Sequence, residues 1–214
     1  MGLLDRLAPR SRESEPPPPS PASDVEPLFS TKAFRKFLTC FAGRESPVLV
    51  DLGPVVGANI SFFGEQLGCK IFIEDLFADL DRHIRAGTTD RFTEMLKHRF
   101  PQSPASVDGI LCWDLIDYLD RPAASQLAEQ LARILRPDGA LLAFFATAQT
   151  NDPRYTKYVI ADEGNLRHRS YPAARSRQTI LLNRDIIRLF PALRVSDSFL
   201  LQNNLREILF RKPA

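Results

Sequence analysis

The sequence predicts an α/β protein with a doubly wound, mainly parallel sheet that ends in an antiparallel C-terminal hairpin. Two observations support this fold class. Short segments that are apolar throughout alternate with amphipathic helical segments along most of the chain, which is typical of parallel strands covered by helices on both faces. Near the end, only the polar run Q-N-N separates two strand-like segments, and so short a connection joins antiparallel neighbours.

The expected elements follow in order. After Ser30, a candidate N-cap, apolar residues recur at helical spacing over residues 31–42. We expect strands over residues 47–52, 70–75, 106–113 and 140–145, and helices over residues 58–67, 76–85, 91–100 and 122–135. A short helix over residues 183–190 then precedes the two final strands, over residues 193–201 and 206–211.

Length and composition indicate one globular domain with an appendage. The chain has 214 residues and a formal net charge of +2, which gives no support for nucleic-acid binding. Residues 1–29 are rich in proline and charge and poor in apolar groups, so we expect a disordered tail before a domain over residues 30–214. A docking role for this tail is the alternative interpretation.

Three cysteines, Cys40, Cys69 and Cys112, lie in apolar surroundings. They indicate buried, reduced thiols and therefore a cytoplasmic protein. The three histidines share no ligand spacing with them, so we expect no metal site. No apolar run approaches the roughly 20 residues needed to cross a bilayer, so we expect no integral membrane segment.

The segment D51-L-G-P-V-V-G57 is the first candidate for a ligand-binding loop. It follows a buried strand, and ligands of doubly wound sheets bind at the carboxyl ends of the strands. Gly53 allows an unusual turn and Gly57 allows close packing of helix and strand. Val55 stands where a dinucleotide loop needs a glycine, which favours a nucleoside-type cofactor without a pyrophosphate. A plain strand-to-helix turn is the alternative.

Acidic side chains mark the ends of the next two strands. Glu74 and Asp75 close the second strand, where a carboxylate suits the two hydroxyls of a ribose. Trp113 and Asp114 close the strand over residues 106–113, and we expect them across the cleft from the first strand. Alternatively, the tryptophan is plain core and the aspartate only starts a helix.

Together these motifs resemble those of class I S-adenosylmethionine-dependent methyltransferases, which have a Rossmann-like fold. The segment at residues 51–57 is similar to the family's glycine motif, F72-I-E-D-L-F to its ribose-binding motif, residues 108–119 to its fourth motif, and L135-R-P-D-G to the turn before its fifth strand. The resemblance implies S-adenosyl-L-methionine as cofactor. It also assigns cofactor contacts to Asp51, Gly53, Gly57, Glu74 or Asp75, Asp108, Trp113 and Asp114, and among the two acids at the second strand we favour Asp75.

Two departures from the family pattern support a second hypothesis. Val55 replaces the middle glycine, and no segment between residues 85 and 106 matches the family's third strand. We therefore consider an active methyltransferase with an unknown, small-molecule acceptor, and alternatively a catalytically inactive, methyltransferase-like binding or scaffold protein. An NAD-dependent enzyme is disfavoured by the loop and by the hairpin ending.

The segment over residues 149–177 is too long for a plain connector and is typical of a lid or binding loop. Its arginines suit a carboxylate or phosphate on a substrate, and His168 is a candidate base. A solvated basic loop, or arginines paired with Asp162 and Glu163, is the alternative. The polar and aromatic candidates in it are Tyr155, Tyr158, Arg167, His168, Arg169, Tyr171, Arg175 and Arg177.

Overall fold

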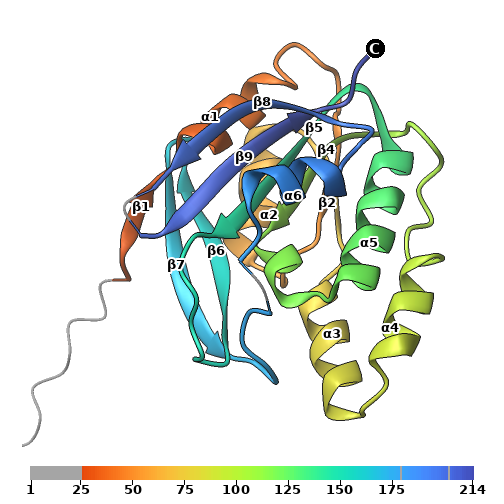
Figure 1. The fold of residues 1–214 in the computed structure, drawn as a ribbon. Coiled ribbons are helices and arrows are strands. Elements are labelled where there is room, and N and C mark those ends of the chain that lie inside the picture. The colour runs from red at the N-terminus through yellow and green to blue at the C-terminus, as the bar shows by residue number, and fades with distance from the viewer. Residues whose placement is uncertain (1–25, 179, 202) are drawn as a thin grey trace, which may run out of the picture.

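The structure, a computed structural model, describes residues 26–178, 180–201 and 203–214 (Figure 1). Its central element is a six-stranded sheet in the order β3-β2-β4-β5-β9-β8. The first four strands in this order run parallel, and β9 and β8 follow antiparallel, which confirms the predicted sheet and its hairpin ending. The strands are β2 (Val48–Asp51), β3 (Lys70–Ile73), β4 (Val107–Trp113), β5 (Leu135–Ala146), β8 (Arg194–Leu200) and β9 (Leu205–Arg211).

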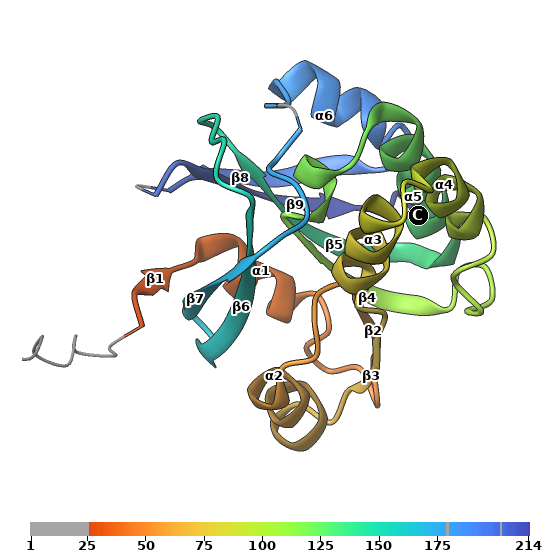
Figure 2. The same cartoon turned by 90° about the horizontal axis from the view of Figure 1, so that it is seen from below.

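Helices cover both faces of this sheet (Figure 2). One face packs against α3 (Leu76–Arg85), α4 (Thr89–Leu96), α5 (Arg121–Ile134) and α6 (Asn183–Leu189). The other packs against α1 (Lys32–Thr39) and against η1 (Phe62–Gln66), a π-helical turn that continues α2 (Gly57–Ser61). The strands are apolar on both sides because successive side chains serve opposite cores.

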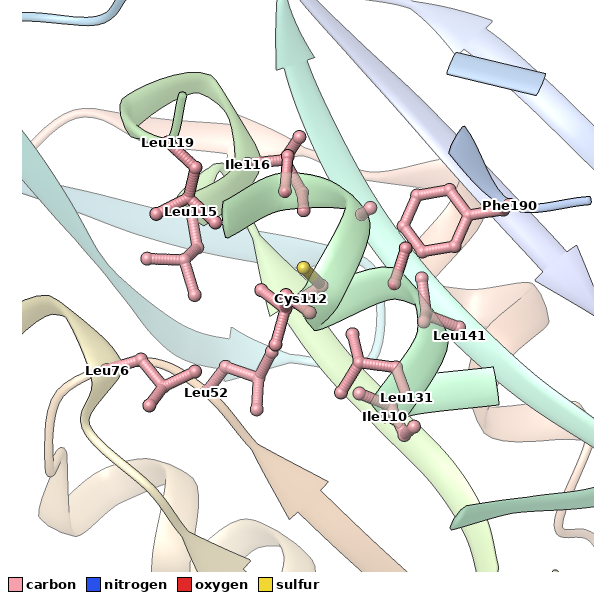
Figure 3. Close-up of a cluster of buried hydrophobic side chains, with 14 of the residues drawn as sticks. Leu52, Leu76, Ile110, Cys112, Leu115, Ile116, Leu119, Leu131, Leu141 and Phe190 are labelled. Atoms are coloured by element: carbon pink, nitrogen blue, oxygen red, sulfur yellow. The ribbon is translucent and has the colours of Figure 1, made fainter. Parts of the chain in front are cut away.

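Neighbouring residues of one strand show this division. Leu141 of β5 belongs to the core under α5, whereas Leu142 belongs to the core under α1. Figure 3 shows the centre of the first core, where Cys112 of β4 lies among the side chains of Leu52, Leu131 and Phe190. The two cores hold the carboxyl ends of β2, β3 and β4 in fixed positions, and the candidate site lies there.

A second sheet forms from the lid segment, where we expected a loop without assigned strands. Its three antiparallel strands have the order β1-β7-β6. They are β1 (Leu28–Ser30), β6 (Arg154–Asp162) and β7 (Asn165–Pro172). The β-branched and aromatic residues that dominate positions 155–160 and Gly164 in the turn were the available signals for this hairpin.

Strand β1 also moves the start of the domain. Residues 28–30 pair with β7, although we had assigned residues 28 and 29 to the tail, and residues 1–25 of the expected tail lie outside the described residues. The N-cap of α1 is Thr31 and not Ser30, because the Thr31 side chain accepts a hydrogen bond from the amide of Phe34. The short β1 is therefore part of the folded unit.

The predicted absence of the family's third strand agrees with the described residues between α3 and β4. They contain α4 and its connections and no strand, so β3 is an edge strand of the sheet. Across the residues with described coordinates, every helix is too short or too polar to cross a membrane. The same residues contain no cluster of three potential metal ligands.

Candidate functional site

The loop after β2 begins with a buried carboxylate. Asp51 is the last residue of β2 and its side chain is only 1% exposed. Its Oδ1 accepts hydrogen bonds from the amide of Gly53 at 2.9 Å and from Nε1 of Trp113 at 2.6 Å. Burial raises the pKa of Asp51 to about 6, although both hydrogen bonds oppose this shift. The chain's own groups therefore hold one oxygen of this carboxylate.

Trp113, at the end of β4, lies directly over Gly53. A Cβ atom at Gly53 would lie 2.8 Å from Cδ1 and 2.9 Å from Nε1 of the indole, so this position accommodates only glycine without movement. Trp113 itself has φ of 51°, a left-handed conformation that is strained for a bulky side chain. Such strain persists only where the surroundings enforce it, and it is concentrated at functional sites.

The remaining loop residues are more open than expected. A Cβ atom at Gly57 would meet nothing within 4 Å, so the predicted need for glycine in close packing is wrong. The side chain of Val55 is 60% exposed and points away from the core. One residue that sequence reasoning missed is Asn59 of α2, which is buried and binds β6 through both amide atoms, with no sequence signal to identify it.

The two acids after β3 have different surroundings. Glu74 is buried, forms an ion pair with Arg99 and accepts a hydrogen bond from Gln102. Asp75 is half-buried, caps α3 by accepting from the amide of Ala78 and has φ of 38°. Its charge raises the pKa of Asp51, as a smaller effect than burial. The backbone on either side of Asp75 is hydrogen-bonded to Asp51 and Leu52, so Asp75 lies beside the loop, whereas the Glu74 carboxylate is already bound by Arg99 and Gln102.

Asp108 is far from this site, which corrects its assignment to the cofactor cleft. It lies near the start of β4, where it pairs with Arg44 and Arg136 and accepts a hydrogen bond from the amide of Val48, the first residue of β2. Trp113 lies five residue steps further along the strand, a distance of roughly 17 Å. Asp108 connects the amino ends of two strands and does not lie at their carboxyl ends, where Asp51 and Trp113 are found.

A buried polar cluster lies beyond Trp113. Asp114 and Asp117 are 0% and 1% exposed. Arg177, from the segment between β7 and α6, contacts Asp114 Oδ2 at 2.9 Å. Burial raises the pKa of Asp117 to about 8, and burial also raises that of Asp114 while Arg177 opposes it. Asp117 Oδ1 and Arg177 Nε have no hydrogen-bond partner, although Nε lies 3.7 Å from Asp117 Oδ2. The Tyr158 hydroxyl and the Asp114 carboxyl interact with each other.

The aromatic side chain that covers this site comes from β6. The ring of Tyr158 is stacked on the indole of Trp113, with centroids 5.1 Å apart and an angle of 8° between the planes. Tyr158 was one of the lid candidates, but the sequence did not indicate this contact. Because Tyr158 is 3% exposed and Trp113 is 2% exposed, the pair closes the space above Gly53.

The other lid candidates have separate roles. His168 lies between the rings of Phe29 and Tyr158, and burial lowers its pKa to about 4, so it is neutral at pH 7. Arg169 pairs with Glu26, and Arg175 donates to the carbonyl of Tyr118. The alternative interpretation, in which arginines of this segment pair with Asp162 and Glu163, is not found among the described contacts. The Asp162 carboxylate instead accepts from Gly164 and Asn165.

Comparison with known proteins reveals similarity to methyltransferases. No family model matches the sequence. Over 93 residues the chain is 34% identical to the probable biofilm formation methyltransferase WspC of Pseudomonas aeruginosa. The match covers 41% of this chain and 21% of that protein, so the chain spans about a fifth of the length of the curated relative it matches.

Two solved structures share the fold. One is 1,6-didemethyltoxoflavin-N1-methyltransferase of Burkholderia thailandensis with bound 1,6-didemethyltoxoflavin and S-adenosylhomocysteine (TM-score 0.53, 17% identity, 85% of this chain and 79% of that chain). The other is an S-adenosylmethionine-dependent methyltransferase from Clostridium acetobutylicum (TM-score 0.52, 11% identity, 85% and 92%). At these identities the likeness shows the fold, and it confirms the Rossmann-like α/β architecture predicted from the sequence.

Proposed function

We propose that this chain, which has the Rossmann-like fold found in S-adenosylmethionine-dependent methyltransferases, is itself such an enzyme and acts on a small molecule. The observation that carries the proposal is the position of Asp75 beside the Asp51–Gly53 loop. Both lie at the carboxyl ends of neighbouring parallel strands, where ligands of this fold bind. The sequence similarity to one methyltransferase and the fold shared with others support it.

The residues at the ribose end suit the cofactor. The side chain of Asp75 is half-buried and accessible at the end of β3, and a carboxylate can accept hydrogen bonds from both hydroxyls of a ribose. Glu74 is the poorer candidate because Arg99 and Gln102 already contact its two oxygens. We therefore assign the ribose contact to Asp75.

The residues at the methionine end suit the cofactor only after the side chain of Trp113 has moved. Gly53 and Asp51 are the candidate contacts there, and the indole of Trp113 covers both. The indole covers only this end of the proposed cofactor site and leaves Asp75, at the ribose end, uncovered. The chemistry that the bound cofactor would supply is an activated methyl group, and the protein's contribution to such a transfer is mainly alignment of the acceptor and removal of a proton.

The polar cluster of Asp114, Asp117 and Arg177 is our candidate for the acceptor end of the cleft. Asp117 Oδ1 and Arg177 Nε, which lack hydrogen-bond partners, are unusual in a folded interior and suit a polar ligand group. A small-molecule acceptor is in keeping with the Burkholderia enzyme, whose structure contains 1,6-didemethyltoxoflavin. The free thiols Cys40, Cys69 and Cys112 are consistent with the reducing environment of the cytoplasm.

A catalytically inactive binding protein is the second candidate function. Two observations favour it: the described sheet ends at β3 without a further strand, and Trp113 covers the loop that would hold the methionine part. Isothermal titration calorimetry with S-adenosylmethionine, S-adenosylhomocysteine and NAD, followed by methyl-transfer assays on a panel of small nitrogen and oxygen acceptors, separates the candidates.

Each outcome of these assays has one interpretation. Binding of the first two ligands together with methyl transfer supports the enzyme. Binding without transfer to any acceptor supports the binding protein. Tight NAD binding would contradict both.

A further inference from the structure

We infer that the indole of Trp113 is a built-in occupant of the cofactor cleft, held in place by Tyr158, and that cofactor binding displaces it. The inference rests on the proposed function, because it concerns the same site. It follows from the contacts of the indole, from its backbone conformation and from the way in which β6 is anchored.

The indole occupies the position that a ligand on the glycine loop would take. Its Cδ1 and Nε1 atoms lie so close to Gly53 that not even a methyl group fits between them. Its N–H also donates to Asp51 Oδ1 at 2.6 Å. One side chain thus fills the space above the loop and satisfies the carboxylate at its base, as a cofactor's methionine part would otherwise do.

The backbone of Trp113 is strained in this position. Its φ of 51° belongs to the left-handed region, which glycine and asparagine adopt far more readily than tryptophan. Contacts of the side chain must therefore maintain the conformation. A residue held in this way can move to an ordinary backbone conformation when its side-chain contacts are replaced.

Tyr158 and its strand supply the contacts that keep the indole in place. Its ring stacks on the indole at 5.1 Å and meets Phe144 edge-on at 5.0 Å. The backbone immediately after this ring is anchored to α2, because Asn59 donates to the carbonyl of Tyr158 and accepts from the amide of Ile160, each at 2.9 Å. Displacement of the indole therefore also disturbs the packing of β6 against α2.

The first experiment uses the fluorescence of the unmodified protein. Trp113 is the single tryptophan of the chain, so tryptophan emission reports on this side chain alone. We expect S-adenosylhomocysteine, which cannot transfer a methyl group, to shift the emission maximum to longer wavelength and to increase quenching by acrylamide, as the indole moves from a 2% exposed position into water.

A matched pair of variants tests the role of the tyrosine. Tyr158→Leu removes the stacking on the indole and should tighten S-adenosylhomocysteine binding by about twofold to tenfold, the equivalent of one aromatic pair. Phe199→Leu is the control, because Phe199 lies on the edge strand β8, where its ring contacts Lys32 and Lys36, and the substitution should leave the affinity unchanged. Circular dichroism and thermal melting establish that both variants are folded.

The outcomes separate this inference from the proposed function. Calorimetric binding without a change in tryptophan emission would overturn the inference and leave the proposed function standing. Binding only to Tyr158→Leu, or binding to both proteins with the emission shift, supports the inference. If neither protein binds the ligand, both the inference and the proposed function are wrong.

Discussion

Substitution of Asp117 by asparagine should remove a large part of the pH dependence of the protein's stability. Asp117 is buried within η2 (Leu115–Tyr118), where its Oδ2 accepts a hydrogen bond from the amide of Ala146 at 2.7 Å and its Oδ1 has no partner. Burial raises its pKa to about 8 from 3.8, so the folded state favours the protonated form. An asparagine side chain has nearly the same shape and is neutral at every pH.

The magnitude follows from the difference between the folded and unfolded pKa values. A raised carboxyl pKa gives stability that is complete below pH 3.8 and disappears as the pH rises through about 8. With these two values, the protonated Asp117 contributes roughly 4 kcal/mol at pH 5, about 1 kcal/mol at pH 7 and almost nothing at pH 9. Relative to the variant, the wild type should therefore lose about 4 kcal/mol between pH 5 and pH 9.

Urea unfolding at pH 5, 7 and 9, followed by tryptophan fluorescence, measures this difference. The free energy of unfolding of Asp117→Asn minus that of the wild type should rise steadily with pH. Asp90→Asn is the control, because Asp90 is exposed on α4 and its variant should follow the pH curve of the wild type. Parallel curves for Asp117→Asn and the wild type would show that Asp117 is already ionised in the folded protein.

Three further predictions concern the loop and the acids. Asp75→Ala should weaken S-adenosylhomocysteine binding by roughly 1–3 kcal/mol in calorimetry, through lost hydrogen bonds. Glu74→Gln should leave that affinity unchanged, and the reverse result would reassign the ribose contact. Gly53→Ala should destabilise the fold by about 1–3 kcal/mol in thermal or urea unfolding, because its Cβ would collide with the indole. Gly57→Ala, with open space around its Cβ, should remain within about 1 kcal/mol of the wild type. Asp108→Ala should lower stability by about 1–3 kcal/mol by leaving two arginines and an amide without their partner, and a change in ligand affinity would contradict its placement away from the cleft.

Local sequence features determined much of this fold. The continuous apolar runs correctly predicted the parallel strands, and Q-N-N indicated the final hairpin, because periodicity and turn length depend on neighbouring residues. The position of the Asp51–Gly53 loop followed in the same way, since a glycine turn after a buried strand of this fold class is placed at the carboxyl edge. For the ribose contact at the end of β3, the sequence left two adjacent candidates, Glu74 and Asp75.

Other features depended on contacts between segments far apart in the sequence. Asp108 and Asp114 are six positions apart, yet the extended strand between them places them at opposite ends of β4. The choice between the two acids after β3 as the proposed ribose contact depends on Arg99. This residue lies 25 positions from Glu74 in the sequence and forms an ion pair with it. The sequence alone could not predict this pairing.

The lid segment gives the clearest example of a structure that depends on contacts between distant segments. The sequence determined that residues 149–177 form more than a connector, but pairing with β1 from the start of the domain made them a sheet. Docking on α2 then placed Tyr158 over the indole of Trp113. Local patterns specify where strands and turns begin, whereas the side chain that covers the glycine loop is decided only when three distant segments pack together.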